Sequence, residues 1–263
     1  MKENLTTSNL LGYRISNRGF RGDIAQALQL MQSGRNNRYA ACANPHSLVV
    51  AANDKVFASA LKEADILLPD GIGIILAARI LGLPIYQRVA GFEFFQGLNK
   101  TLAEEGGARY FFLGSTNDVL ERITNKINIE YENISVCGTF SPPFKPDFSE
   151  DEKIQMVNAI NIAKPDVLWV GMTAPKQEKW IYQNRDKLSV PFIGAIGAVF
   201  EFYAGTKKRA SRFWCSIGLE WLPRFLHEPV RLWERNMKSA PKFLFWILKE
   251  KMQQMKRGMK NDL

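Results

Sequence analysis

The stretch ADILLPDGIGII, residues 64–75, joins a short apolar run to a second apolar segment through Pro69, Asp70 and Gly71. Residues 66–68 have the length and composition of a buried strand, and the apolar residues after Gly71 recur at helical spacing. The stretch therefore predicts a strand, a tight turn and a helix. Asp70 keeps two interpretations here, because aspartate is a favoured helix N-cap and is also a carboxylate that catalysis can use.

The same alternation continues along the chain. Apolar runs predict further strands at residues 39–43, 110–113, 134–137, 166–170 and 192–196. The intervening segments predict helices at residues 45–62, after 71, and at 91–105, 118–129, 150–163 and 175–186. Nearly continuous apolar strands separated by helices are typical of a parallel sheet covered on both faces. We therefore expect residues 1–203 to form an α/β, Rossmann-like body.

Parallel sheets of this kind bind ligands at the carboxyl ends of their strands. In this sequence those ends carry polar and small residues: Asn44 and Pro45, Asp70 and Gly71, 114–117, 171–178 and 194–197. Asp70 therefore lies at an edge where substrates are handled, which strengthens its interpretation as a functional carboxylate.

Composition and motifs exclude several classes of protein. The 263 residues are 46% apolar, which is enough for a full core, and the three cysteines are too few and too scattered for a disulfide framework. We expect no signal peptide and no membrane-spanning helix. Two histidines, no Asp-x-Asp and no glycine-rich nucleotide motif argue against a metal centre or a dinucleotide site. We therefore expect no metal and no cofactor.

The net charge of +9 is confined to one end of the chain. Residues 1–203 hold 21 basic and 21 acidic residues, whereas residues 204–263 hold 14 basic and 5 acidic residues, together with four of the six tryptophans. We therefore expect a second unit, a basic aromatic helical appendage over residues 204–263. Such a segment suits an anionic membrane surface, and it also suits closure of the core or a dimer contact.

Taken in order, these pieces resemble the WecG/TagA/CpsF family of bacterial glycosyltransferases. The matching residues are Asn44-Pro45, the segment 64–82 with Asp70-Gly71, Arg88–Gly91, 112–114, 170–178, 193–197, Ala204-Gly205, Arg209-Ala210, 218–222, Arg224, Glu228-Pro229 and Arg231. The resemblance covers roughly residues 12–240. Its strength lies in the number, order and spacing of the pieces, since none of them is specific alone.

The resemblance implies an inverting transfer of a sugar from a UDP-sugar to an undecaprenyl-diphosphate-linked sugar, at the cytoplasmic face of the membrane. It implies Asp70 as the general base that takes the proton from the acceptor hydroxyl. Without a metal, fixed donors must neutralise the leaving diphosphate, and Arg88 is a candidate because guanidinium binds phosphate through two parallel hydrogen bonds. The alternative for Arg88 is an ordinary surface arginine.

Further site residues follow from the same resemblance. Gln177 can donate to and accept from a sugar hydroxyl or a uracil edge, unless residues 176–178 form only an ordinary first helical turn in which Glu178 favours the helix dipole. Asn44 either lines the pocket or forms a turn before its helix. Cys42, whose thiol is a weak donor, stands where the family often has threonine. The remaining substrate-binding candidates are Gly71, Gly114, Lys176 and Gly197 in the body, and Arg224, Arg231 and Arg235 in the appendage.

Arg235 carries less weight than the other two arginines, because the family pattern places an arginine where this chain has Glu234, and one residue rotates a helical side chain by about 100°. Two other functions stay open. The basic, aromatic end could bind nucleic acid, although its apolar content suits a bilayer better, and the fold could serve as a scaffold without catalysis. The donor sugar, the polysaccharide pathway and the oligomeric state, including a homo-oligomer, are not determined by the sequence.

Overall fold

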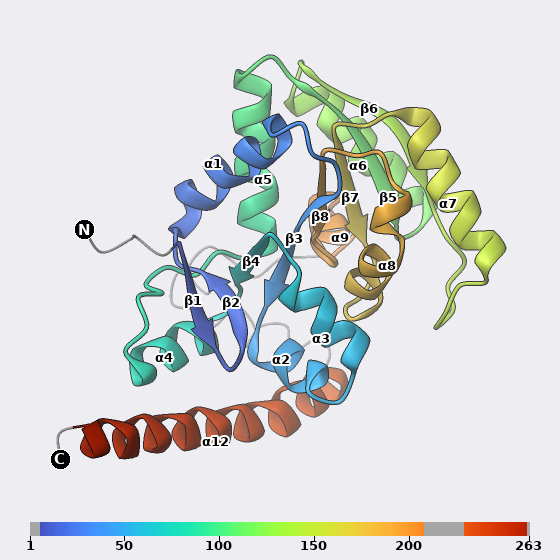
Figure 1. Cartoon of the computed structure of the whole chain (residues 1–263). Helices are drawn as coiled ribbons and strands as arrows, with labels where there is room; N and C mark the ends of the chain where they lie inside the picture. The colour runs from blue at the N-terminus through green and yellow to red at the C-terminus, as the bar shows by residue number, and fades with distance from the viewer. Residues whose placement is uncertain (1–5, 208–228, 262–263) are drawn as a thin grey trace.

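The computed structural model describes residues 6–207 and 229–261 (Figure 1). Its strands are β1 (Thr7–Leu10), β2 (Tyr13–Ser16), β3 (Arg38–Ala43), β4 (Ile66–Pro69), β5 (Ala108–Gly114), β6 (Ile134–Phe140), β7 (Val167–Gly171) and β8 (Phe192–Ala195). Its helices are α1 (Gly19–Gln32), α2 (Pro45–Ala51), α3 (Lys55–Lys62), α4 (Ile72–Leu81), α5 (Gly91–Glu104), α6 (Asn117–Glu130), α7 (Glu150–Ala163), α8 (Lys176–Asn184), α9 (Val199–Tyr203) and α12 (Pro229–Asn261), with a 3-10 turn, η1 (Arg185–Lys187).

Six of these strands form one sheet in the order β4-β3-β8-β7-β5-β6, and every neighbouring pair is parallel. All six occur where the apolar runs of the sequence predict them. The expected parallel α/β fold is therefore confirmed. All carboxyl ends of a parallel sheet lie at the same edge, so the segments that follow these strands share one side of the molecule.

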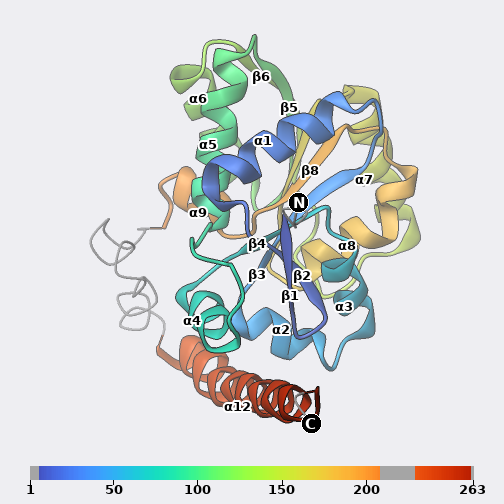
Figure 2. The ribbon, with the colours of Figure 1, turned by 60° about the vertical axis from the view of Figure 1, so that its left-hand side comes forward.

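Helices cover both faces of the sheet, and each face has its own apolar core (Figure 2). Residues of α2, α3, α4, α7 and α8 pack on one face, and residues of α1, α5, α6 and α9 pack on the other. On the second face, the Phe95 ring lies 4.9 Å from the Trp169 ring and 5.1 Å from the Tyr203 ring, in edge-to-face geometry. Strands buried on both sides explain why their sequences read as continuous apolar runs.

Two parts of the fold differ from the sequence prediction. The helix expected over residues 45–62 is two helices, because the side chain of Asp54 accepts a hydrogen bond from the Phe57 backbone N–H at 3.0 Å and begins α3 anew. Residues 7–32 form an antiparallel hairpin, β1–β2, followed by α1, where no element was predicted. The hairpin packs beside β4 without joining the main sheet.

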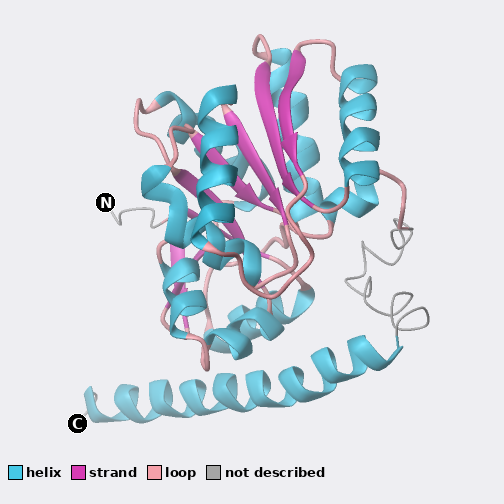
Figure 3. Cartoon of the chain, turned by 90° about the vertical axis from the view of Figure 1, so that its right-hand side faces the viewer, coloured by secondary structure: helices cyan, strands magenta, loops and turns pink. Residues whose placement is uncertain are grey.

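The last described element, α12, crosses beneath the body and packs on α2 and α4 (Figures 1 and 3). Within α12, the stretch KFLFWIL at residues 242–248 is divided between two faces: Phe243 and Ile247 are buried with Ser239, whereas Phe245 is 63% exposed. Across residues 6–207 and 229–261, no helix combines the length and hydropathy that crossing a bilayer requires.

Candidate active site

The carboxyl ends of four adjacent strands, β4, β3, β8 and β7, lie side by side along one edge of the sheet, and this region is called the strand-end centre below. The Asp70 backbone N–H donates to the Ala43 carbonyl at 2.9 Å, which ties the end of β4 to the end of β3. The Ile196 N–H donates to the Val170 carbonyl at 3.1 Å, which ties β8 to β7. After β3 the chain enters one face, at α2, and after β8 it enters the other, at α9. This opposite departure of neighbouring strands creates the crevice in which α/β sheets bind ligands.

Asp70 is half-buried in the turn between β4 and α4. The N-cap of α4 is Gly71, at φ +94°. Asp70 is therefore not the N-cap, which removes one of its two interpretations. A backbone φ in this region favours glycine, and a Cβ on Gly71 would lie 3.9 Å from the Asn44 Cβ. The turn thus brings the Asp70 segment directly against the start of α2.

Asn44 caps α2. Its Oδ1 accepts a hydrogen bond from the Ser47 backbone N–H at 2.9 Å, and its own N–H donates to the Ser47 Oγ at 2.8 Å. This reciprocal pair satisfies two backbone donors at the helix start. The structural interpretation of Asn44 is therefore correct, and the residue also lies at the predicted edge of the sheet.

Cys42 lies among the acidic residues of the site. Burial raises the pKa of its thiol well above the usual range, and the negative charges of Asp70, Glu178 and Glu93 raise this pKa further. A hydrogen bond from the Gly91 backbone N–H acts in the opposite direction. A Cβ on Gly91 would lie 3.3 Å from the Cys42 Sγ, so the start of α5 packs closely on this thiol. Cys42 is therefore a neutral thiol, and it lies close enough to three carboxyl groups for their charges to raise its pKa.

Arg88 precedes α5 on a loop that is fixed to the end of β4, because the Val89 N–H donates to the Pro69 carbonyl at 3.0 Å. Its Nη2 lies 3.5 Å from Glu93 Oε1. The Asp70 turn follows the end of β4, and the Arg88 loop is hydrogen-bonded to that same strand end. A guanidinium and a carboxylate that are 18 positions apart in the sequence therefore belong to one part of the edge.

Gln177 and Glu178 occupy the first turn of α8, which follows a cis Ala174–Pro175 peptide bond. Both side chains are buried, and Gln177 Nε2 donates to Glu178 Oε1 at 2.8 Å. Burial raises the pKa of Glu178 to about 7. A Cβ on Gly197, which follows β8, would lie 3.4 Å from Gln177 Oε1. The sequence prediction gave Glu178 only the role of an acidic residue in a first helical turn. Its position next to Gln177, after a buried strand, was the signal that could have indicated a site residue.

The structure does not bring every predicted residue to this centre. Lys176 turns toward the loop before α7, where its Nζ donates to the Lys145 carbonyl and lies 3.8 Å from the centre of the Phe148 ring. At Gly114 a Cβ would lie 2.5 Å from the Gly171 carbonyl oxygen, so the packing of β5 against β7 already requires glycine there. Arg224 lies outside the described residues, and Arg231 and Arg235 lie on α12 with side chains outside the description.

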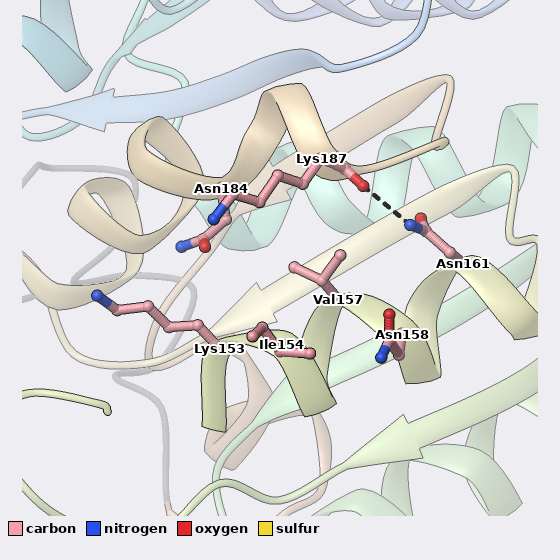
Figure 4. A pocket seen from close by; sticks show the side chains of 7 residues that line it. All are labelled: Lys153, Ile154, Val157, Asn158, Asn161, Asn184 and Lys187. Atoms are coloured by element: carbon pink, nitrogen blue, oxygen red, sulfur yellow. Dashed lines mark hydrogen bonds between the residues drawn. The ribbon is translucent and has the colours of Figure 1, made fainter. Parts of the chain in front are cut away.

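A groove of about 290 Å³ lies elsewhere, between α7 and the end of α8 (Figure 4). Its lining includes Lys153, Asn161 and Lys187, and Asn161 Nδ2 donates to the Lys187 carbonyl at 2.9 Å. None of the residues predicted for the site lines this groove, so it is separate from the strand-end centre.

A doubly wound parallel sheet with a carboxylate, a guanidinium and an amide beside the carboxyl ends of β4 and β7 defines an α/β enzyme that binds its substrate across the sheet edge. The family described as "Glycosyl transferase WecG/TagA/CpsF family" matches residues 8–257, and the chain belongs to this family. It is therefore a glycosyltransferase, which confirms the resemblance seen in the sequence.

Two characterised relatives carry the name N-acetylglucosaminyldiphosphoundecaprenol N-acetyl-beta-D-mannosaminyltransferase. The protein from Bacillus subtilis (strain 168) is 30% identical over 207 residues, which cover 79% of this chain and 77% of the relative. The protein from Staphylococcus aureus (strain MW2) is 31% identical over 218 residues, which cover 82% of each chain.

Proposed function

We propose that this chain transfers a sugar, with inversion, from a UDP-sugar to a sugar linked to undecaprenyl diphosphate, in the synthesis of a cell-surface polysaccharide. The names of the relatives support an N-acetylmannosaminyl donor and an N-acetylglucosaminyl-diphosphoundecaprenol acceptor. The observation that carries the proposal is Asp70, a half-buried carboxylate at the carboxyl end of β4, where Gly71 rather than Asp70 is the N-cap of the next helix.

Asp70 is the general base in this proposal. An inverting transfer needs one carboxylate to remove the proton from the acceptor hydroxyl as that oxygen attacks the anomeric carbon. The bond from the anomeric carbon to the UDP oxygen breaks in the same step, and UDP leaves with the electron pair. The fixed geometry of the Asp70 turn, set by Gly71 and by the hydrogen bond to Ala43, favours a carboxylate held in one position.

Arg88 balances the charge of the leaving diphosphate, together with arginines of the appendage, for which Arg224, Arg231 and Arg235 are the candidates. Fixed cationic donors stabilise developing negative charge without a bound metal. Gln177 binds a polar group of the sugar substrates. Residues 204–263 act as the second unit in this proposal, closing the active site and holding the enzyme at the membrane.

The exposed face of α12 supports membrane association. Leu244, Phe245, Leu248, Met252 and Met255 are about half exposed or more. At about 100° per residue they fall within an arc of about 100°. The exposed Lys242, Lys249 and Lys256 run along one border of this arc, two helical turns apart. An apolar strip beside a row of lysines suits the interface of an anionic inner leaflet, so we place the enzyme peripherally on the cytoplasmic face of the membrane.

The test is transfer by Asp70→Asn with a panel of UDP-sugars and a short-chain polyprenyl-diphosphate N-acetylglucosamine, with EDTA present. We expect kcat to fall by a factor of about 10² to 10⁴ with an unchanged circular dichroism spectrum. Asp118→Asn is the matched control, because Asp118 is exposed on α6 and pairs with Arg122 at 2.9 Å. Wild-type kcat in Asp70→Asn would remove the proposed base, and loss of wild-type transfer in EDTA would remove the metal-free mechanism.

A further inference from the structure

Glu178 is a buried acidic residue that the proposed mechanism does not use. Its side chain is 2% exposed, and that of Gln177 is 4% exposed. One carboxyl oxygen, Oε1, accepts the hydrogen bond from Gln177 Nε2. The other oxygen, Oε2, and the amide oxygen of Gln177 are buried without a hydrogen-bond partner among the described residues. Two adjacent polar atoms in this state cost free energy unless a ligand satisfies them.

The charged groups around Glu178 do not neutralise it. On its own helix, Lys176 turns to the Lys145 carbonyl, and Lys179 pairs with Asp54, the N-cap of α3, at 3.0 Å. Farther along, Arg185 pairs with Glu63, the C-cap of α3. From β3 the neighbour is Cys42, and the negative charges of Glu178 and Asp70 both raise the pKa of its thiol. None of these cations pairs with Glu178, and burial, the largest cause of its raised pKa, favours its protonated form.

Building on the function proposed above, we propose that Gln177 and Glu178 form an uncharged pair that binds a neutral substituent of a substrate sugar, with Glu178 acting as a carboxylic acid. Because Glu178 Oε1 holds the amide nitrogen, Gln177 presents its oxygen as an acceptor. Protonated Oε2 of Glu178 presents a donor beside it. A hydroxyl or acetamido group both donates and accepts, so it satisfies both atoms. A phosphate only accepts, and would leave the Gln177 oxygen unpaired.

The position of the pair favours a sugar as its ligand. Glu178 and the proposed base Asp70 act on the same thiol, Cys42, so the pair belongs to the part of the edge where the sugars react. Ionised Glu178 would lose its donor. Binding of the sugar substituent should therefore weaken as the pH rises through about 7, the pKa to which burial raises Glu178.

Steady-state kinetics from about pH 6 to about pH 9 test this pair. In the wild type, the KM of the substrate bound by the pair should rise about tenfold per pH unit above about pH 7. Glu178→Gln keeps a neutral donor and acceptor, so its KM should stay within about twofold across this range. Glu150→Gln, a change at an exposed carboxylate of α7, should follow the wild type. A Glu178→Gln enzyme that is folded but loses more than about tenfold in kcat/KM at every pH would show that the negative charge is needed, and would overturn the proposal.

Calorimetry of the wild-type protein at about pH 8, in buffers of different ionisation enthalpy, provides a test without a variant. If the pair binds the donor sugar, binding of UDP-N-acetylmannosamine should take up a proton. If the pair binds the acceptor sugar, binding of the acceptor analogue should take up a proton. Proton uptake with UDP alone, or with none of the three ligands, would overturn the proposal. These results are independent of Asp70→Asn, so failure of the base and failure of the neutral pair can be told apart.

Discussion

His46 Nδ1 on α2 lies 2.8 Å from Ser239 Oγ on α12 and joins the C-terminal helix to the body. The helix α2 begins one residue after its cap, Asn44, and α4 begins after Asp70 and Gly71. The two helices that carry α12 thus both start at the candidate active site. The same two helices, α2 and α4, therefore hold α12 in position and fix the segments that carry Asn44 and Asp70.

The His46–Ser239 contact should contribute measurably to the docking of α12. We expect a double-mutant cycle of His46→Ala and Ser239→Ala, measured by urea unfolding, to give a coupling free energy of about 0.5–1.5 kcal/mol. The cycle removes the effect of other contacts that His46 makes. A coupling energy of zero would mean that apolar packing alone holds the helix.

The two faces of α12 should respond differently to the same substitution. Phe245→Ser removes an exposed ring, so it should weaken binding to anionic liposomes without changing the unfolding midpoint. Phe243→Ser removes a ring that is packed against the body and only 5% exposed, so it should lower the free energy of unfolding by about 3–5 kcal/mol. Sedimentation with liposomes and with duplex DNA measures the first effect. Duplex binding without liposome binding would favour the nucleic-acid alternative instead.

Gly71 should matter for activity beyond its backbone strain. Gly71 and Gly12 have similar positive φ angles, +94° and +85°, and Gly12 lies in the β1–β2 turn with no atom near its missing Cβ. Either change to alanine puts a side chain on strained backbone and should cost about 1–3 kcal/mol of stability. Only Gly71→Ala displaces the Asp70 turn, so only this variant should lose about tenfold or more in kcat/KM. Equal activity in both variants would show that the turn tolerates displacement.

Asp23 should make the protein less stable as the pH rises from about 4 to about 6. Burial raises the pKa of Asp23 to about 6, despite a hydrogen bond from Ser16 Oγ at 2.5 Å and Arg18 at 4.0 Å. An unfolded aspartate titrates near about 3.9, so the folded state holds the proton more tightly between these values. The free energy of unfolding therefore falls as the pH rises through this window.

Asp23→Asn should remove that fall. Relative to the wild type, the variant should gain about 2–3 kcal/mol between about pH 4 and about pH 7, measured by urea unfolding. The exposed Asp118→Asn should show almost no change in this difference. A wild-type and an Asp23→Asn curve that run parallel in pH would contradict the raised pKa.

Local patterns in the sequence predicted the six sheet strands, most of the helices between them and the family. The positions of Asp70, Gly71, Asn44 and Gln177 at strand ends also followed from the sequence, because a strand end is a local feature. The break between α2 and α3 was present as Asn53-Asp54, a recognisable turn and cap, although the sequence prediction ran one helix through it.

The sequence by itself determined which segments become strands and helices, since periodicity and turn chemistry act over a few residues. Only the tertiary structure decided that β3 lies between β4 and β8, that Asp70 and Glu178 reach the same thiol, and that Phe243 is buried while Phe245 faces solvent. Those relations depend on strand pairing and on burial by residues far apart in the chain. The free energy of such contacts arises only when distant segments pack together, so a short window of sequence cannot predict them.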